Sequence, residues 1–145
     1  MNSSKLNSVR VPGWDRALED VATAHIDIAP EWGKSDCLLT AADAIFAVTG
    51  IDPLAKFRGK YKTEKGAARK MLKNGCENVR DVFEKYLDLE PVNRFAARRG
   101  DVGVMIINGE YTAGFICGSG FAVKQPHGLT FFPITEIEQA YKVGD

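Results

Sequence analysis

The sequence predicts an α+β domain in which helices come first and a small antiparallel sheet packs behind them. Two observations support this order. Up to about residue 87, apolar residues recur at helical spacing, whereas after residue 100 they form short runs separated by turn residues. Helices followed by a run of strands is the pattern of an α+β architecture. A chain of 145 residues is also large enough to bury one core without disulfide bonds.

Four helices are expected in the first part of the chain. They are predicted at residues 14–28, 36–49, 63–73 and 79–87. The second is apolar on nearly every side, which indicates a buried central helix, and Gly50 follows it as a typical C-terminal cap. Pro30 and Pro91 are expected to stop the first and last helices.

Strands are expected after Gly100-Asp101. They are predicted at residues 102–107, 111–117, 121–124 and 129–132, and a short closing helix is predicted at 134–141. The pair Asn108-Gly109 favours a type I′ hairpin between the first two strands. The domain is expected to span residues 14–145. Residues 1–13 are interpreted as a polar arm that is either disordered or ordered on a neighbouring subunit.

Composition limits the possible partners and cofactors. The 19 basic residues balance the 19 acidic ones, so no overall field favours nucleic acid or an anionic membrane. No apolar run is long enough for a membrane helix, and no signal peptide is expected. Three widely spaced cysteines and two histidines predict no metal site, and no cofactor is expected. Basic residues do gather between Arg58 and Lys73, either as a solvated face or as a contact for an acidic partner or nucleic acid.

One stretch, Trp32-Gly33-Lys34-Ser35-Asp36-Cys37, places a cysteine in the first turn of the central helix. The positive end of a helix stabilises a thiolate, and Asp36 can cap the same helix end. Three roles remain open for Cys37: a buried packing residue, a reactive thiol without turnover, or a nucleophile. Trp32 either packs to fix the loop or stacks on a ligand.

This stretch, with the later Arg99-Gly100-Asp101-Val102, resembles the NlpC-type cell-wall cysteine peptidases, a branch of the papain-like fold. The chain is also similar to small proteins encoded in phage and prophage tail modules, through Thr49-Gly50-Ile51-Asp52-Pro53 and Phe57-Arg58-Gly59-Lys60-Tyr61. The resemblance implies a structural component of a tail tip or baseplate. Such a protein is made in the host cytoplasm, resides in the virion and contacts other tail proteins.

The resemblance also identifies a departure from the peptidases. Their catalytic histidine precedes a Val-Gly-Ile-like segment, and here Thr112 stands at that position in Thr112-Ala113-Gly114. Lys124 or Gln125 stands where the orienting residue is expected. Threonine cannot accept a proton from a thiol near neutral pH, so the resemblance implies a fold without catalysis. The candidate ligand-binding positions are therefore Trp32, Asp36, Thr112 and Lys124. The alternative is a hydrolase of peptidoglycan peptides, with Cys37 as the nucleophile and His127 as an unorthodox base.

Overall fold

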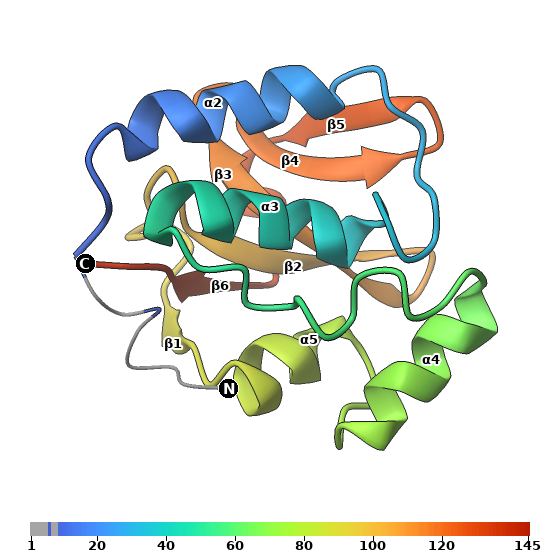
Figure 1. The fold of residues 1–145 in the computed structure, drawn as a ribbon. Coiled ribbons are helices and arrows are strands. Elements are labelled where there is room, and N and C mark those ends of the chain that lie inside the picture. Colours follow the sequence, from blue (N-terminus) through green and yellow to red (C-terminus); the bar gives the residue numbers. More distant parts are fainter. Residues whose placement is uncertain (1–5, 7–8) are drawn as a thin grey trace.

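The computed structural model describes Leu6 and residues 9–145. Two helices, α2 (Trp14–His25) and α3 (Cys37–Thr49), lie side by side on one face of an antiparallel sheet (Figure 1). Both agree with the predicted helices, although α2 ends three residues before the expected limit. Gly50 caps α3 with a φ of 75°, as its position after an apolar helix predicts. The α+β class expected from the sequence is confirmed.

The other helices lie beyond α3. The basic helix α4 (Glu64–Lys73) stands away from the sheet and buries only Ala67 (Figure 1). The predicted helix at 79–87 begins as α5 (Val79–Asp81) and continues as a π-helical turn at Val82–Tyr86. Its wider spacing is seen in the hydrogen bond from the Leu87 N–H to the Val82 carbonyl.

The sheet has six strands in the order β1-β6-β2-β3-β4-β5, all antiparallel to their neighbours. The strands are β1 (Glu90–Val92), β2 (Val102–Ile107), β3 (Glu110–Cys117), β4 (Gly120–Gln125), β5 (Gly128–Phe132) and β6 (Gln139–Lys142). The β2–β3 turn has positive φ at Asn108 and Gly109, as the predicted type I′ turn requires.

The C-terminal prediction was wrong. Instead of a closing helix at 134–141, a single 3₁₀ turn (Ile134–Glu136) leads into β6, which lies between β1 and β2. This strand, near the C-terminus, pairs with β2 and places Tyr141 in the core beside Phe83. The short edge strand β1 was also missed, because Pro91 reads as a breaker when its partner strand is not known.

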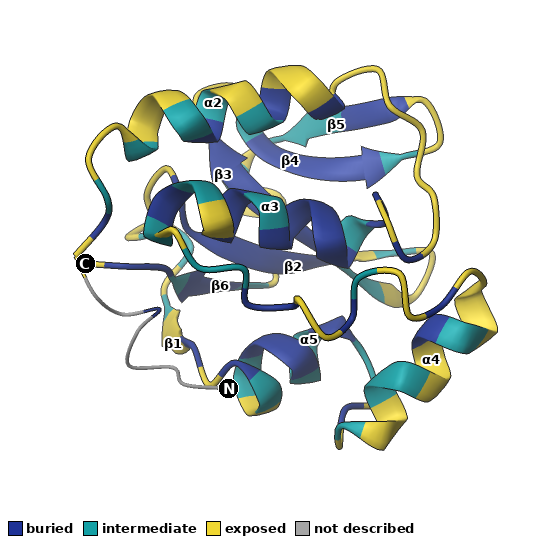
Figure 2. Ribbon diagram, in the orientation of Figure 1, coloured by how far each residue is buried: buried dark blue, intermediate teal, exposed yellow. Residues whose placement is uncertain are grey.

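The core lies between the sheet and the helices. Leu39, Ala42 and Ile45 of α3 are fully buried, and Val104, Ala113 and Phe115 meet this helical layer from β2 and β3. The buried segments of α3 and of the central strands are visible in Figure 2. A smaller cluster that includes Met105, Ile116 and Phe121 covers the opposite face of the sheet.

The described part of the predicted arm packs on the domain itself. Leu6 is fully buried, and the Val11 N–H donates to the carbonyl of Val48 at the end of α3. Arg10 forms a buried ion pair with Asp101 at 3.1 Å and donates from Nε to the Val143 carbonyl. The rest of the arm, residues 1–5 and 7–8, lies outside the described residues.

Candidate functional site

The first turn of α3 is organised around the Asp36 carboxylate. Its Oδ1 accepts the Leu39 N–H at 2.9 Å, which is the predicted helix cap. Its Oδ2 accepts both the Gly33 N–H and the Tyr61 hydroxyl, each at 2.9 Å. Asp36 is buried, and these three donors fix the loop that delivers Cys37 to the helix.

The motif before α3, at residues 32–37, meets the motif at residues 57–61, which follows α3, at this point. The Gly59 N–H donates to the Gly33 carbonyl at 2.8 Å, so the segment around Gly59 runs against the Trp32-Gly33 turn. Gly33 has a φ of 83°, and a Cβ there would lie 2.0 Å from the Tyr61 carbonyl oxygen. Only glycine allows so close an approach between two backbones. The motifs at residues 32–37 and 57–61 therefore form one structural unit.

Cys37 is half-buried, and the surroundings of its thiol disfavour the thiolate. Burial raises its pKa to about 11, and the negative charge of Asp36 acts in the same direction. Hydrogen bonding with the backbone of Ala113 and Leu38 favours the thiolate but does not offset these effects. Burial, together with the charge of Asp36 and the hydrogen bond to it, likewise raises the pKa of the Tyr61 phenol. At neutral pH this site holds a protonated thiol beside a neutral phenol.

The register of β3 determines which of its side chains face Cys37. Ala113 is buried in the core shared with α3, and its backbone contacts the Cys37 thiol. Successive side chains of a strand point to opposite faces, so Thr112 points to the face turned away from α3. The Thr112 hydroxyl donates to the Glu110 carbonyl of its own strand at 3.4 Å. A histidine directed at Cys37 from this strand would therefore have to replace Ala113, not Thr112.

His25 is buried at the end of α2 and joins two other side chains. Its Nε2 lies 2.8 Å from Asp43 Oδ2 on α3, and its Nδ1 lies 2.8 Å from Lys124 Nζ on β4. An ammonium group only donates, so Nδ1 accepts from Lys124 and Nε2–H donates to Asp43. Both ring nitrogens are thus used within the structure.

Lys124 is a buried structural cation. Its Nζ also donates to the carbonyls of Ile28 and His25, at 2.8 and 3.3 Å, and thereby holds the chain that leaves α2. Burial lowers the pKa of its ammonium group. The candidate binding residue Lys124 is therefore enclosed among protein groups, with only 4% of its surface exposed.

The same network reaches the motif after α3. Arg58 bridges Asp43 and Asp52, with 2.7 Å between its Nε and Asp52 Oδ2. Burial would raise the pKa of the Asp43 carboxyl, but the hydrogen bond from His25 and the charge of Arg58 hold it below its usual value. Lys124, His25, Asp43, Arg58 and Asp52 therefore connect β4, α2, α3 and the following loop.

His127, the other histidine, occupies the β4–β5 turn. It is exposed, and its Nε2 lies 3.4 Å from the Thr130 hydroxyl of the same hairpin. The turn packs against the end of α2, where the Leu129 N–H donates to the Ile26 carbonyl. Neither histidine is among the groups with the largest effects on the Cys37 thiol.

A pocket of about 620 Å³ opens beside the unit formed by the Trp32-Gly33 turn and the segment at residues 57–61. Trp32, with 42% of its surface exposed, lines it together with the backbone of Gly33 and Gly59. The complete lining is Glu31, Trp32, Gly33, Lys34, Arg58, Gly59, Tyr61 and Lys62. Of the predicted binding residues, Trp32 borders this space, and Asp36 supports its wall through Tyr61.

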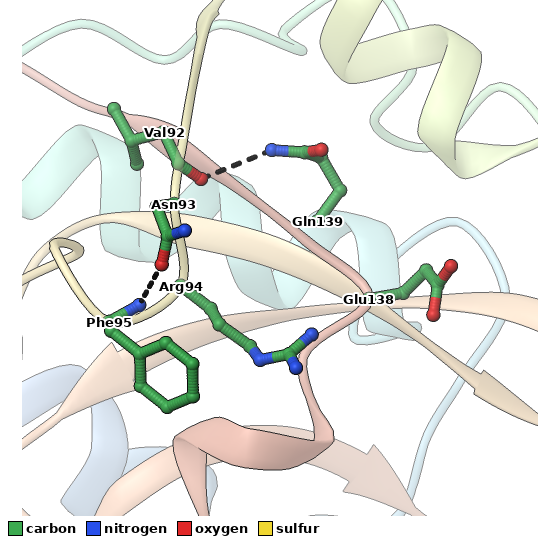
Figure 3. A pocket seen from close by; sticks show the side chains of 6 residues that line it. All are labelled: Val92, Asn93, Arg94, Phe95, Glu138 and Gln139. Carbon is green, nitrogen blue, oxygen red and sulfur yellow. Dashed lines mark hydrogen bonds between the residues drawn. The ribbon is translucent and has the colours of Figure 1, made fainter.

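A second, smaller pocket of about 220 Å³ lies between the end of β1 and the start of β6 (Figure 3). Arg94 crosses it, donates from Nη1 to the Ile137 carbonyl and lies over the Phe95 ring. Within the described residues, the buried Nε of Arg94 has no hydrogen-bond partner. Sequence inspection did not identify this pocket, because β1 and β6 were not predicted.

Comparison with known proteins identifies a domain family. Residues 9–143 match the family described as "Domain of unknown function (DUF6950)". The chain belongs to this family. No curated protein and no solved structure gives a match. The matched DUF6950 region takes in both motifs around α3, the sheet and the described residues 9–13 of the arm.

The described residues contain no cluster of three or more His, Cys, Asp or Glu side chains placed to bind a metal, and among them no helix could span a membrane. Sequence reasoning missed the network of His25, Asp43 and Lys124. The available signal was Asp43, the one charged residue of the helix at 37–49, since its partners lie on distant segments.

Proposed function

We propose that this chain is a non-catalytic assembly component of a phage or prophage tail tip or baseplate, built on a domain related to the NlpC-type peptidases. One observation supports the proposal that the domain is not catalytic. Cys37 occupies the position of a nucleophile at the start of a central helix, yet burial and Asp36 disfavour its thiolate. A cysteine nucleophile needs a low pKa or an adjacent base.

The positions and contacts of the two histidines support the same proposal. His25 uses both ring nitrogens on Asp43 and Lys124, and His127 lies in an exposed hairpin turn next to Thr130. A general base has to be within hydrogen-bond reach of the proton it accepts. The tail-tip assignment itself rests on the sequence motifs. Two of them, residues 32–37 and 57–61, meet at Asp36 and Gly33.

The test is complementation of a prophage or phage from which this gene has been deleted. We expect the deletion to prevent formation of infectious particles and the wild-type chain to be found in purified virions. A Cys37→Ala variant should restore infectivity fully, as should Cys76→Ala, a matched control at a buried cysteine outside the site. Cys37→Ser provides a second variant if the alanine variant folds poorly.

Two results would overturn the proposal. The chain could be missing from particles whose assembly does not require it. Alternatively, Cys37→Ala and Cys37→Ser could enter particles normally while infectivity falls to the level of the deletion. The second result would favour the peptidoglycan hydrolase, with Cys37 as its nucleophile.

A further inference from the structure

The pocket beside Trp32 has walls that are fixed by buried contacts. The Gly59 N–H bonds to the Gly33 carbonyl, and the Gly33 N–H and Tyr61 hydroxyl both bond to buried Asp36. Its volume of about 620 Å³ falls in the range of ligand pockets. A preformed pocket of this kind loses little entropy when it binds a ligand.

Trp32 is presented to solvent by this fixed turn. Trp32 is 42% exposed, although the neighbouring Gly33 is buried against Tyr61. The sequence left open whether Trp32 packs or stacks on a ligand, and the exposed ring at the pocket favours stacking. Aromatic rings held on rigid backbone are common anchor points in binding sites, because they bury a large area with few rotatable bonds.

The charges that line the pocket select the ligand. Lys34 and Lys62 are exposed, and neither forms an ion pair with any of the described residues. Arg58 is already paired with Asp43 and Asp52, so its charge is balanced. Glu31 is the one carboxylate in the lining. The free charge is therefore two ammonium groups on flexible side chains, opposed by a single carboxylate.

We propose that this pocket binds an acidic peptide segment of a partner protein. An apolar side chain of the segment lies on the Trp32 indole, and its carboxylates pair with Lys34 and Lys62. A nucleic acid is disfavoured, because the chain has no net charge and two free lysines neutralise few phosphates. The inference concerns only the chemistry of this pocket, so it does not depend on the tail assignment.

The experiment uses the fluorescence of Trp32. The chain has two tryptophans, so Trp14→Phe leaves Trp32 as the only indole. The full-length variant is titrated with an acetylated and amidated hexapeptide of alternating Glu and Leu. Two further titrations use the same peptide with Gln in place of Glu and a thymidine hexanucleotide. Calorimetry with the wild-type chain provides a second readout.

We expect the acidic peptide to change the Trp32 emission saturably, with little response to the glutamine peptide or the oligonucleotide. The double substitution Lys34→Gln with Lys62→Gln should weaken binding about tenfold, in keeping with two exposed ion pairs. The matched control, Lys56→Gln with Lys73→Gln, removes the same charge from exposed lysines that lie outside the pocket and form no ion pair with the described residues, and it should leave affinity unchanged. Thermal unfolding shows whether each variant is folded.

Three results would overturn the inference. The acidic peptide could fail to saturate at millimolar concentration, the two peptides could bind equally, or both double variants could weaken binding to the same extent. A saturable response to the oligonucleotide alone would identify a nucleic-acid site instead. None of these results would affect the complementation test of Cys37.

Discussion

The close backbone approach at Gly33 leads to a quantitative prediction for Gly33→Ala. A residue with a Cβ at a φ of 83° costs roughly 1–2 kcal/mol. The Cβ would also lie 2.0 Å from the Tyr61 carbonyl oxygen, which is backbone and can move only with its segment. Displacing a packed segment costs roughly 1–3 kcal/mol, so the total is about 2–5 kcal/mol.

Gly59→Ala is the matched control. Gly59 belongs to the same unit and has a φ of 69°, but no atom lies within 4 Å of a Cβ built there. It should therefore cost only the conformational strain, roughly 1–2 kcal/mol. Urea unfolding measures both variants. With a slope of about 2 kcal/mol/M, a loss of 3 kcal/mol lowers the midpoint by about 1.5 M.

The comparison of the two variants isolates the contact between the motifs. Gly33→Ala should unfold at a clearly lower urea concentration than Gly59→Ala. Equal midpoints would refute the reasoning, because they would mean that the Gly33 and Tyr61 backbones do not meet as closely as the structure has them.

Three further predictions concern the buried polar network and the register of β3. Lys124→Met leaves His25 Nδ1 and the Ile28 carbonyl without their donor, so unfolding free energy should fall by about 2–4 kcal/mol; a midpoint equal to that of the wild type would contradict this role. The pKa of Asp43 is lowered on folding, so its contribution to stability is complete above a pH of about 4 and is lost as the pH falls through the pKa of the folded state. Between neutral and acid pH, the thermal unfolding temperature of Asp43→Asn should therefore fall less steeply than that of the wild type. Thr112→His should leave the pH profile of Cys37 alkylation unchanged, because position 112 faces away from α3, and a shifted profile would show that the register argument is wrong.

Local patterns in the sequence were sufficient for most of the fold. The apolar helix 37–49, its Gly50 cap and the Asn108-Gly109 turn are all determined by residues close together in the chain. The strand at 139–142 was not predictable in this way. A short apolar run is equally compatible with a helix and with a strand, and only the pairing with β2 decides between the two.

In the candidate site, too, local features were predictable from the sequence and long-range contacts were not. The Asp36 cap and the position of Cys37 follow from the helix start, and both were predicted. The partners of the site come from segments 18 to 99 residues apart, as in the contacts of His25 with Asp43 and Lys124. The face on which Thr112 lies depends on strand register, which one sequence leaves undetermined until the packing of Ala113 is known.

The most direct test of the non-catalytic account is the rate of Cys37 alkylation by iodoacetamide as a function of pH, measured with Cys76 and Cys117 changed to Ala. With a thiol pKa of about 11, only about 0.1% is thiolate at pH 8, against about a quarter for a free cysteine. We predict a rate that is slow at pH 8, rises through about pH 11, where half of the thiol is ionised, and is the same in His127→Ala. A thiol that titrates below pH 8, with a rate that collapses in His127→Ala, would contradict the account and establish a cysteine–histidine pair.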